Sequence, residues 1–223
     1  EELARLDAAA DLDGLQAAEQ AAQAAYLREA RLLSRTRSKA ALQLGKAITQ
    51  AMQGLGMSGG SFEVRVQDAA QPLACGLDDI VFLVAGHAGT TPRPVAKVAS
   101  GGELSRLALA IAVTTSRLGT AQTLIFDEVD AGVGGAVAET VGRLMRQLGV
   151  DRQVLAVTHL PQVAACANHH LVVSKQLQGA STLSSVAAAH GEARVAEIAR
   201  MLGGERLLET TVAHAKEMLQ ASE

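Results

Sequence analysis

The feature that most constrains this chain is a proline-free stretch from about Gly14 to Leu55. Ala, Gln, Leu, Glu, Arg and Lys predominate in it, and these residues lose little entropy in a helix. The stretch therefore predicts one long helix, preceded by a separate short helical piece near residues 1–10. Apolar residues at spacings of seven, four, three and four predict a coiled-coil seam whose partner is not evident in the chain; they are Leu33, Ala40, Leu44, Ala47 and Ala51.

The same helix carries a concentration of positive charge. Between positions 28 and 46 there is one acid, Glu29, against six basic residues: Arg28, Arg31, Arg35, Arg37, Lys39 and Lys46. Such a cluster can hold a DNA backbone through phosphate contacts without reading sequence. A solvated helix face is the alternative interpretation.

Composition excludes several classes of protein. The chain has 223 residues, 48% of them hydrophobic and 2% aromatic, with a net charge of −3. The aliphatic content is sufficient for a buried core, and no apolar run approaches the ~18 residues of a membrane span. Two distant cysteines, Cys75 and Cys166, argue against a disulfide scaffold or a zinc cluster and favour a reducing cytosol. The scarcity of aromatic residues argues against single-strand binding by base stacking.

After a group of glycines between positions 54 and 60, apolar residues recur at every second position instead of at helical spacing. Residues 62–66 predict a half-buried strand, and residues 80–84 predict a more fully buried one, so the two form an antiparallel pair. The stretch 86–98, with its glycines and prolines, predicts a loop. Arg93 and Lys97 in that loop are near enough to the next motif to approach a phosphate, although a solvated loop is the simpler interpretation.

The remaining chain alternates helix and strand, which predicts an α/β fold with a largely parallel sheet. Three ranges describe the expected organisation: a coiled-coil strand over 1–55, a β-hairpin and proline-containing loop over 56–98, and an α/β lobe over 99–223. Predicted helices cover 104–112, 136–148, 194–202 and 207–219, and predicted strands cover 123–126, 153–157, 171–174 and 182–186.

A predicted buried strand, residues 123–126, ends in two adjacent acids, Asp127 and Glu128. Side chains at the carboxyl end of a parallel strand project into the crevice where ligands bind. An aspartate there is suited to Mg²⁺, and the next acid is suited to polarise an attacking water. The alternative is that the pair merely opens a surface loop.

Ser100, Gly101, Gly102 and Glu103 immediately precede a predicted helix. Glycines allow close approach of a ligand, and the free N–H groups and dipole of a helix N-terminus favour an anion. The alternative is an ordinary capping box made by Ser100 and Glu103.

Two further polar residues occupy strand ends. His159 follows the predicted strand 153–157 at a position where it can contact a γ-phosphate or orient a water, and Asp130 follows the acid pair. The alternatives are a polar strand terminus and a turn residue. His169 and His170 have no third ligand nearby and are interpreted as surface or packing residues.

Taken together, segments 98–106, 124–135 and 157–164 closely resemble three segments of the RecN family of bacterial DNA repair proteins. These proteins are ABC-type ATPases of the structural-maintenance-of-chromosomes (SMC) class. The specific feature is the joint occurrence of Ser-Gly-Gly-Glu-Leu-Ser-Arg, from position 100, and Asp-Glu-Val-Asp-Ala-Gly, from position 127.

The resemblance implies a role for each motif. Ser100, Gly101 and Gly102, with Glu103 beside them, would form the signature motif that contacts the γ-phosphate of ATP on a second head. Asp127 would be the Walker B magnesium residue and Glu128 the general base. Asp130 would belong to the D-loop facing the partner, and His159 would be the switch histidine.

The Walker A pattern G-x-x-x-x-G-K-[ST] does not occur in the sequence. The resemblance therefore implies the C-terminal lobe of an ABC/SMC-type P-loop ATPase head, which is inactive alone. Its expected partners are an N-terminal head segment of the same protein, a second head in an ATP-dependent homodimer, and double-stranded DNA or its ends in the bacterial cytosol. The alternatives are the head of another SMC or ABC ATPase and a non-catalytic coiled-coil module that dimerises or binds DNA.

Overall fold

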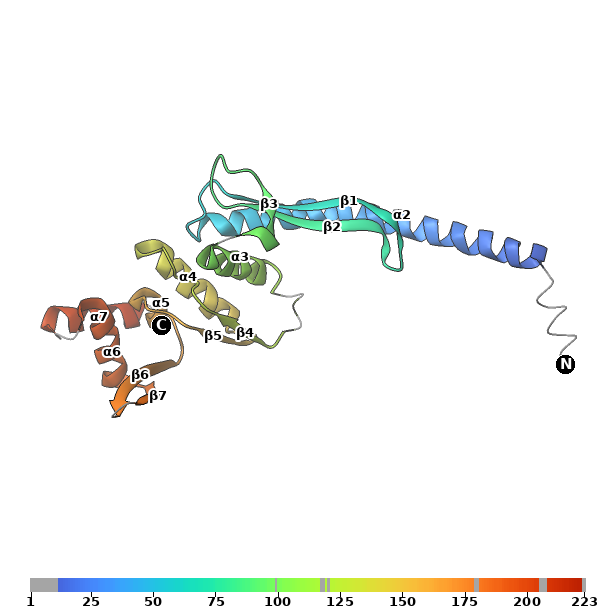
Figure 1. The fold of residues 1–223 in the computed structure, drawn as a ribbon. Helices are drawn as coiled ribbons and strands as arrows, with labels where there is room; N and C mark the ends of the chain where they lie inside the picture. Colours follow the sequence, from blue (N-terminus) through green and yellow to red (C-terminus); the bar gives the residue numbers. More distant parts are fainter. Residues whose placement is uncertain are drawn as a thin grey trace, which may run out of the picture. The chain divides into compact units, whose positions relative to one another are not determined.

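The structure is a computed structural model that describes residues 12–98, 100–116, 119, 121–178, 181–204 and 208–221. The predicted helical piece at 1–10 lies outside the described residues. Two compact units are present, one made of residues 12–46 and 63–83 and the other of residues 47–62 and 84–221. Figure 1 labels the elements, which are α2 (Leu12–Gln53), β1 (Ser61–Leu73), β2 (Gly76–Ala85), β3 (Arg93–Pro94), α3 (Gly101–Thr114), β4 (Thr123–Phe126), α4 (Gly135–Leu148), β5 (Gln153–Ala156), α5 (Pro161–Ala165), β6 (His170–Gln178), β7 (Ser181–Ala189), α6 (Gly191–Gly203) and α7 (Glu209–Ala221), with a 3₁₀ turn at Val95–Lys97.

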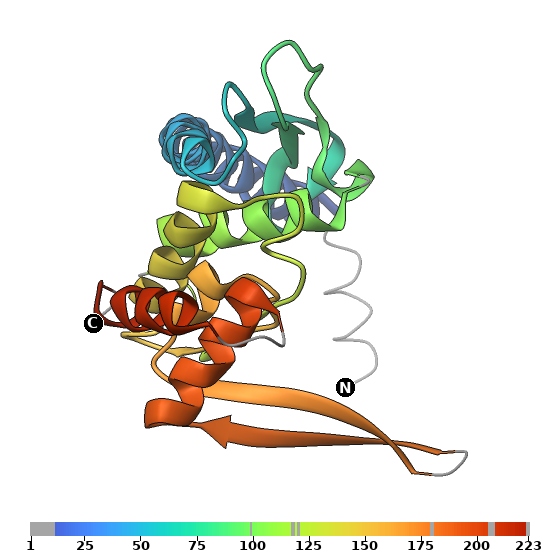
Figure 2. The ribbon, with the colours of Figure 1, turned by 90° about the vertical axis from the view of Figure 1, so that its left-hand side faces the viewer.

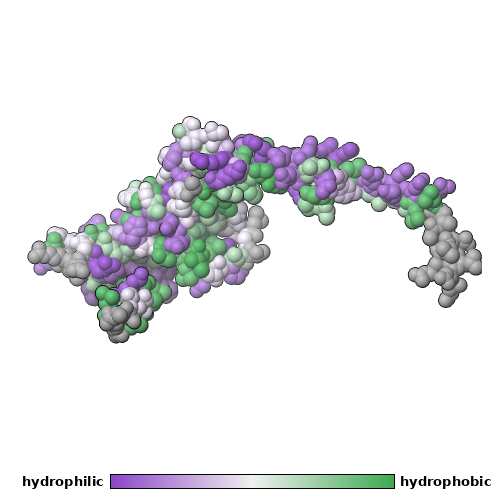
Figure 3. All heavy atoms as spheres, in the orientation of Figure 1, coloured by the Kyte–Doolittle hydropathy of each residue, from purple (hydrophilic) through white to green (hydrophobic). Residues whose placement is uncertain are grey.

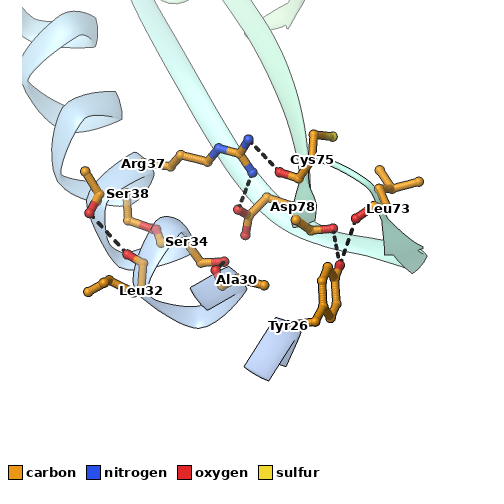
Figure 4. Close-up of polar contacts among 11 residues, drawn as sticks. Tyr26, Ala30, Leu32, Ser34, Arg37, Ser38, Leu73, Cys75 and Asp78 are labelled. Carbon is orange, nitrogen blue, oxygen red and sulfur yellow. Dashed lines mark hydrogen bonds and ion pairs between the residues drawn. The ribbon is translucent and has the colours of Figure 1, made fainter. Parts of the chain in front are cut away.

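In the first unit the long helix α2 confirms the predicted helix, and the β1–β2 hairpin is attached to it by polar contacts (Figure 4). The Tyr26 hydroxyl lies 2.8 Å from the carbonyl oxygen of Leu73 and 3.0 Å from that of Gly76. Arg37 donates to Asp78 at 2.9 Å and to the carbonyl oxygen of Cys75 at 2.9 Å. These contacts join the tip of the hairpin to the helix.

The buried face of α2 in this unit differs from the predicted seam. Ala30 and Ala41 are 5% and 7% exposed, whereas Leu33 of the predicted seam is 39% exposed and Ala40 is exposed. Because α2 is rich in alanine, several of its sides are similarly apolar, and contact with the hairpin selects one of them. The predicted seam lies on a neighbouring side of the helix, where Ala40 and Ala47 are exposed and Leu44 and Ala51 are half-buried.

The hairpin prediction is confirmed in outline, since β1 and β2 are neighbours in one sheet and are joined by two residues, which makes them antiparallel. The expectation that the second strand is more fully buried is wrong at Ile80 and Phe82, which are 37% and 46% exposed. The predicted loop 86–98 contains the short strand β3, which extends this sheet, and the 3₁₀ turn.

In the second unit β4 and β5 pair in parallel, with Phe126 opposite Ala156. This confirms the predicted parallel pairing, but the two strands are not buried as predicted: Ile125 and Leu155 are 69% and 42% exposed. Two parallel strands offer two apolar faces, and both are covered only in a sheet with helices or further strands on each side.

The strands predicted at 171–174 and 182–186 are longer and form a separate antiparallel ribbon, β6–β7, visible in Figure 2. Parallel pairing among the described strands is therefore limited to β4 and β5. The α/β fold class holds. The ribbon is followed by α6 and α7, which begin and end within a few residues of the predicted limits.

A core of small and aliphatic side chains joins α5, α6 and α7; its buried members are Ala164, Ala165, Val195, Ile198, Ala199 and Ala215. Neither cysteine is part of a disulfide: Cys75 is exposed, and Cys166 is buried with its thiol donating to the carbonyl oxygen of Gln162 at 3.3 Å. Among the described helices, none combines the length and the hydropathy of a membrane span.

Candidate functional site

Three segments that the sequence singled out come together in the second unit. The Ser105 hydroxyl of α3 donates to the carbonyl oxygen of Asp127 at 2.6 Å. The backbone N–H of Val157, just after β5, donates to the carbonyl oxygen of Phe126 at the end of β4 at 3.0 Å. The start of α3, the end of β4 and the end of β5 thus form one edge.

The start of α3 is built as a capped helix N-terminus. Ser100 has extended backbone angles, and its hydroxyl accepts from the backbone N–H of Glu103 at 3.4 Å. The carboxylate of Glu103 lies 3.3 Å from Nε2 of His87. Ser100 is therefore the N-cap that the capping-box alternative predicts, although the Glu103 carboxylate lies beside His87; Gly101, the next residue, is exposed.

The segment after β4 packs closely against this helix end. A Cβ atom added to Gly102 would lie 2.9 Å from the Cβ and 3.0 Å from the carbonyl oxygen of Ala131. Arg106, only 6% exposed, donates through Nη1 to that same carbonyl oxygen at 2.6 Å. Burial lowers the pKa of the Arg106 guanidinium, and its Nε has no hydrogen-bond partner among the described residues. A side chain at position 102 would therefore force the segment around Ala131 to shift.

The acid pair is exposed at the end of β4. Glu128 has a φ of 54°, and among the described residues it alone has a positive φ without being glycine. Its Oε2 lies 2.5 Å from the position that a Cβ of Gly101 would occupy. The left-handed backbone thus turns the Glu128 carboxylate toward the start of α3, and such a conformation is costly for a residue with a side chain.

Asp130 and His159 form a second polar group behind the acid pair. Asp130 is 2% exposed, and its Oδ2 accepts from the Thr158 hydroxyl and, at 3.1 Å, from the backbone N–H of His159. The same oxygen lies 3.3 Å from Nδ1 of His159, whose side chain is 71% exposed. The arrangement favours a proton on Nδ1 and leaves Nε2 directed away from Asp130.

The structure therefore brings together all of the predicted site residues: Ser100, Gly101, Gly102, Glu103, Asp127, Glu128, Asp130 and His159. One placement differs from the expectation. Asp130 is enclosed within the chain and does not face outward, because Thr158 and His159 surround its carboxylate. Sequence reasoning assigned no role to Thr158, Ser105 or Arg106; their positions inside the three motifs were the only signal.

The described residues contain no group of three His, Cys, Asp or Glu side chains that would hold a metal ion on its own. Asp127 supplies one exposed carboxylate. That donor set fits Mg²⁺, which keeps several waters and binds through one or two carboxylates together with substrate phosphates.

A small cavity of about 130 Å³ lies beside the helix start. Arg93, Ser100 and Glu103 provide its polar lining, and Met57, Val84 and Leu107 are among its apolar residues. The loop residue Arg93 therefore lies on the same side of the unit as the cap of α3.

Comparison with solved structures identifies the fold. The chain aligns with an Smc head domain with a coiled coil and joint from Pyrococcus yayanosii with a TM-score of 0.53 and 21% identity, over 73% of this chain and 29% of the other. An Smc head domain with an extended coiled coil from Pyrococcus furiosus, bound to the C-terminal domain of ScpA, gives a TM-score of 0.53 and 17% identity over 84% and 45% of the two chains. The chain has the fold of part of an SMC head.

Curated sequence relatives define the similarity more closely. "DNA repair protein RecN" of Vibrio cholerae is 47% identical over 191 residues, which cover 85% of this chain and 34% of that protein. "DNA repair protein RecN" of Treponema pallidum is 38% identical over 220 residues, which cover 96% and 38%. No family profile matches the chain. The chain is thus homologous to the C-terminal third of RecN proteins, and it spans about a third of the length of the curated relatives that it matches.

Proposed function

We propose that this chain is the C-terminal lobe of the head of a RecN-like ATPase that acts in the repair of DNA double-strand breaks and in recombination. One observation carries the proposal. The exposed acids Asp127 and Glu128, the oriented His159 and the N-terminus of α3 occupy one edge of the second unit, in a chain homologous to RecN proteins.

Each residue has a role that its surroundings support. Asp127 would hold Mg²⁺, which supplies charge neutralisation for the phosphates when bound. Glu128 is the proposed general base, since its exposed carboxylate is free to reach a water. His159 would orient that water or contact the γ-phosphate through Nε2, and buried Asp130 keeps the imidazole in place through Nδ1.

Ser100, Gly101 and Gly102 would contact the γ-phosphate of ATP bound mainly by a second head. The N–H groups and the dipole of α3 favour that anion, and Glu103 is held aside by His87. In this arrangement ATP joins the two heads as a homodimer, and hydrolysis separates them.

The proposed site is incomplete within this chain. The sequence contains no G-x-x-x-x-G-K-[ST] loop, and Ile125, Leu155 and Val157 leave apolar surface exposed along β4–β5, at 69%, 42% and 63%. An N-terminal head segment of the same protein would supply the phosphate loop and cover this surface. The proposed location is the bacterial cytosol, at the nucleoid, with double-stranded DNA or its ends as the partner.

The test uses the complete protein and the variant Glu128→Gln. We expect this variant to bind ATP, to lose hydrolysis by at least about 10²-fold, as removal of a general base does, and to accumulate ATP-held dimers in size-exclusion chromatography. Glu139→Gln, an exposed acid on α4, is the matched control and should hydrolyse normally. Ordinary turnover by Glu128→Gln would remove that residue from the role of base.

A second pair of measurements tests the contact in trans. Ser100→Arg should abolish ATP-dependent dimerisation while ATP binding persists, and unchanged dimerisation would contradict the trans contact. The 223-residue chain alone should not hydrolyse Mg-ATP. Turnover by the isolated chain would contradict the proposal that it holds only half of the ATPase site. If Glu128→Gln hydrolyses ATP normally and Ser100→Arg dimerises normally, the chain is better explained as a non-catalytic module.

A further inference from the structure

The basic cluster on α2 resolves into two groups with different surroundings. Arg37 lies on the side that contacts the hairpin and is ion-paired with Asp78, which is 6% exposed. The other five cations are exposed. Their spacings of three, four, four and seven place them on one side of a helix with 3.6 residues per turn; they are Arg28, Arg31, Arg35, Lys39 and Lys46, called here the basic stripe.

The basic stripe faces away from both apolar surfaces of the helix. At about 100° per residue, its centre lies roughly 140° around the axis from the face that contains Ala30 and Ala41, and about as far from the predicted seam. α2 can therefore contact the hairpin and a coiled-coil partner while the stripe remains in solvent. In Figure 3 hydrophilic side chains cover much of the visible surface of α2.

Little negative charge on α2 opposes the stripe. From position 30 to the end of the helix at Gln53 there is no acid. Glu29 lies 3.1 Å from Arg28, but both side chains are highly exposed, at 66% and 73%, and an ion pair of this kind contributes little. One apolar residue, Leu42, occupies the same side between Lys39 and Lys46.

We propose that the basic stripe is a docking surface for the phosphate backbone of duplex DNA. Over the 18 residue-to-residue steps from Arg28 to Lys46 the helix rises roughly 27 Å, the length of about eight base pairs. Exposed Arg and Lys side chains at intervals along this length match a regular row of phosphates. No aromatic or amide side chain belongs to the stripe, so the contact does not read sequence.

This inference deepens the proposed function and rests on it for the choice of DNA as the polyanion. Its test is separate from nucleotide chemistry, because it is performed without ATP. Binding of the 223-residue chain to a fluorescent 30-base-pair duplex is followed by anisotropy between 25 and 200 mM KCl. The variant is Arg31→Glu/Arg35→Glu/Lys39→Glu.

The matched control is Arg65→Glu/Arg143→Glu/Lys216→Glu, three exposed cations on β1, α4 and α7, each beside an acid. It changes the net charge by the same amount. We expect the stripe variant to weaken binding at least tenfold at 50 mM KCl. It should also flatten the slope of log K against log salt by about 2 to 3, because each phosphate contact contributes ~0.9. The control should keep the slope of the wild type.

Circular dichroism verifies that the stripe variant remains as helical as the wild type. Equal losses of DNA affinity in the stripe variant and in the control would show that only net charge matters. Unchanged affinity and salt slope in the stripe variant would show that DNA binds elsewhere. Either result overturns the proposal. Competition by polyglutamate as effective as that by unlabelled duplex would identify an acidic protein as the partner and would overturn it as well. ATP turnover of the complete protein, measured without DNA, should be unchanged by the stripe variant.

Discussion

Replacement of Asp130 tests the link between the buried carboxylate and the exposed histidine. Asp130→Ala removes the acceptor for the Thr158 hydroxyl and the backbone N–H of His159. A hydrogen bond to a charged group contributes about 1.5–3 kcal/mol, and a donor left buried without a partner costs about 1–3 kcal/mol. The ion pair with His159 adds little, because that side chain is 71% exposed.

These contributions predict a loss of about 3 kcal/mol in the free energy of unfolding for Asp130→Ala. For a chain of this length the melting temperature falls by ~2–4 °C per kcal/mol, so we expect a decrease of roughly 6–12 °C. Asp130→Asn keeps one acceptor oxygen without the charge and should lose about half as much. Asp151→Ala, at an exposed position, is the control and should change stability by no more than about 0.5 kcal/mol.

Urea denaturation of the chain measures the stability, and ¹⁵N NMR of the imidazole reports which nitrogen of His159 carries the proton at neutral pH. In the wild type we expect the proton on Nδ1, and in Asp130→Ala a shift toward Nε2. A double-mutant cycle with Thr158→Val should give a coupling energy of about 1–2 kcal/mol. Additive effects of the two substitutions, together with an unchanged tautomer, would contradict a link between Asp130, Thr158 and His159.

Three further predictions concern other contacts. Gly102→Ala should cost about 1–3 kcal/mol in urea denaturation, because its Cβ would meet the Cβ and carbonyl oxygen of Ala131 within 2.9–3.0 Å, whereas Gly101→Ala meets only the flexible end of Glu128 and should cost less. Glu128→Gly should stabilise the chain by about 0.5–1 kcal/mol relative to Glu128→Ala, since glycine adopts a φ of 54° without strain; equal stabilities would contradict the strained backbone. Hydrogen bonds from Ser34 and Arg37 lower the pKa of the Asp78 carboxyl below its ordinary value of 3.8, so the stability that they confer is present at neutral pH and is lost as the pH falls through the lowered pKa. In Asp78→Asn the free energy of unfolding should therefore fall less between pH 5 and pH 2 than in the wild type. An unaltered pH dependence would exclude this ion pair as a source of acid sensitivity.

The elements that the sequence predicted well have strong local signals. The long helix follows from a stretch without proline, and the start of α3 follows from Ser100, which caps the helix as the capping-box alternative predicted. The parallel pairing of β4 and β5 follows from two short apolar runs separated by a helix. Local preference and tertiary structure agree at these places, so the sequence pattern alone is sufficient to predict the element.

The features that could not be predicted depend on contacts between distant residues. Arg37 and Asp78 are 41 positions apart, and their ion pair helps to select which side of an alanine-rich helix is buried. The antiparallel β6–β7 ribbon has the same apolar pattern as a pair of parallel strands. Periodicity reports only that a face is apolar, and the identity of the covering element has to come from the fold.

The candidate site shows the same division. Glu128 and Asp130 are two positions apart in the sequence, yet the sequence did not predict that one turns outward in a left-handed conformation and the other is enclosed by Thr158 and His159. A motif fixes the types of residue that are available. The backbone turn between them decides which carboxylate faces solvent and which one positions a neighbour.

The hydrogen bonds at the start of α3 also have a mechanical consequence. Ser105 holds the carbonyl oxygen of Asp127 at 2.6 Å, Arg106 holds that of Ala131 at 2.6 Å, and these two bonds bracket the acid pair. The start of α3 and the segment with Glu128 are therefore joined by two side-chain hydrogen bonds. In the proposed head dimer the first would face a nucleotide on the partner and the second a nucleotide on its own head, so we expect closure at one nucleotide to move the acid at the other. Arg106→Lys keeps the charge but loses the forked guanidinium, and in the complete protein it should weaken this coupling, lowering the ATP turnover of the dimer more than the affinity for ATP.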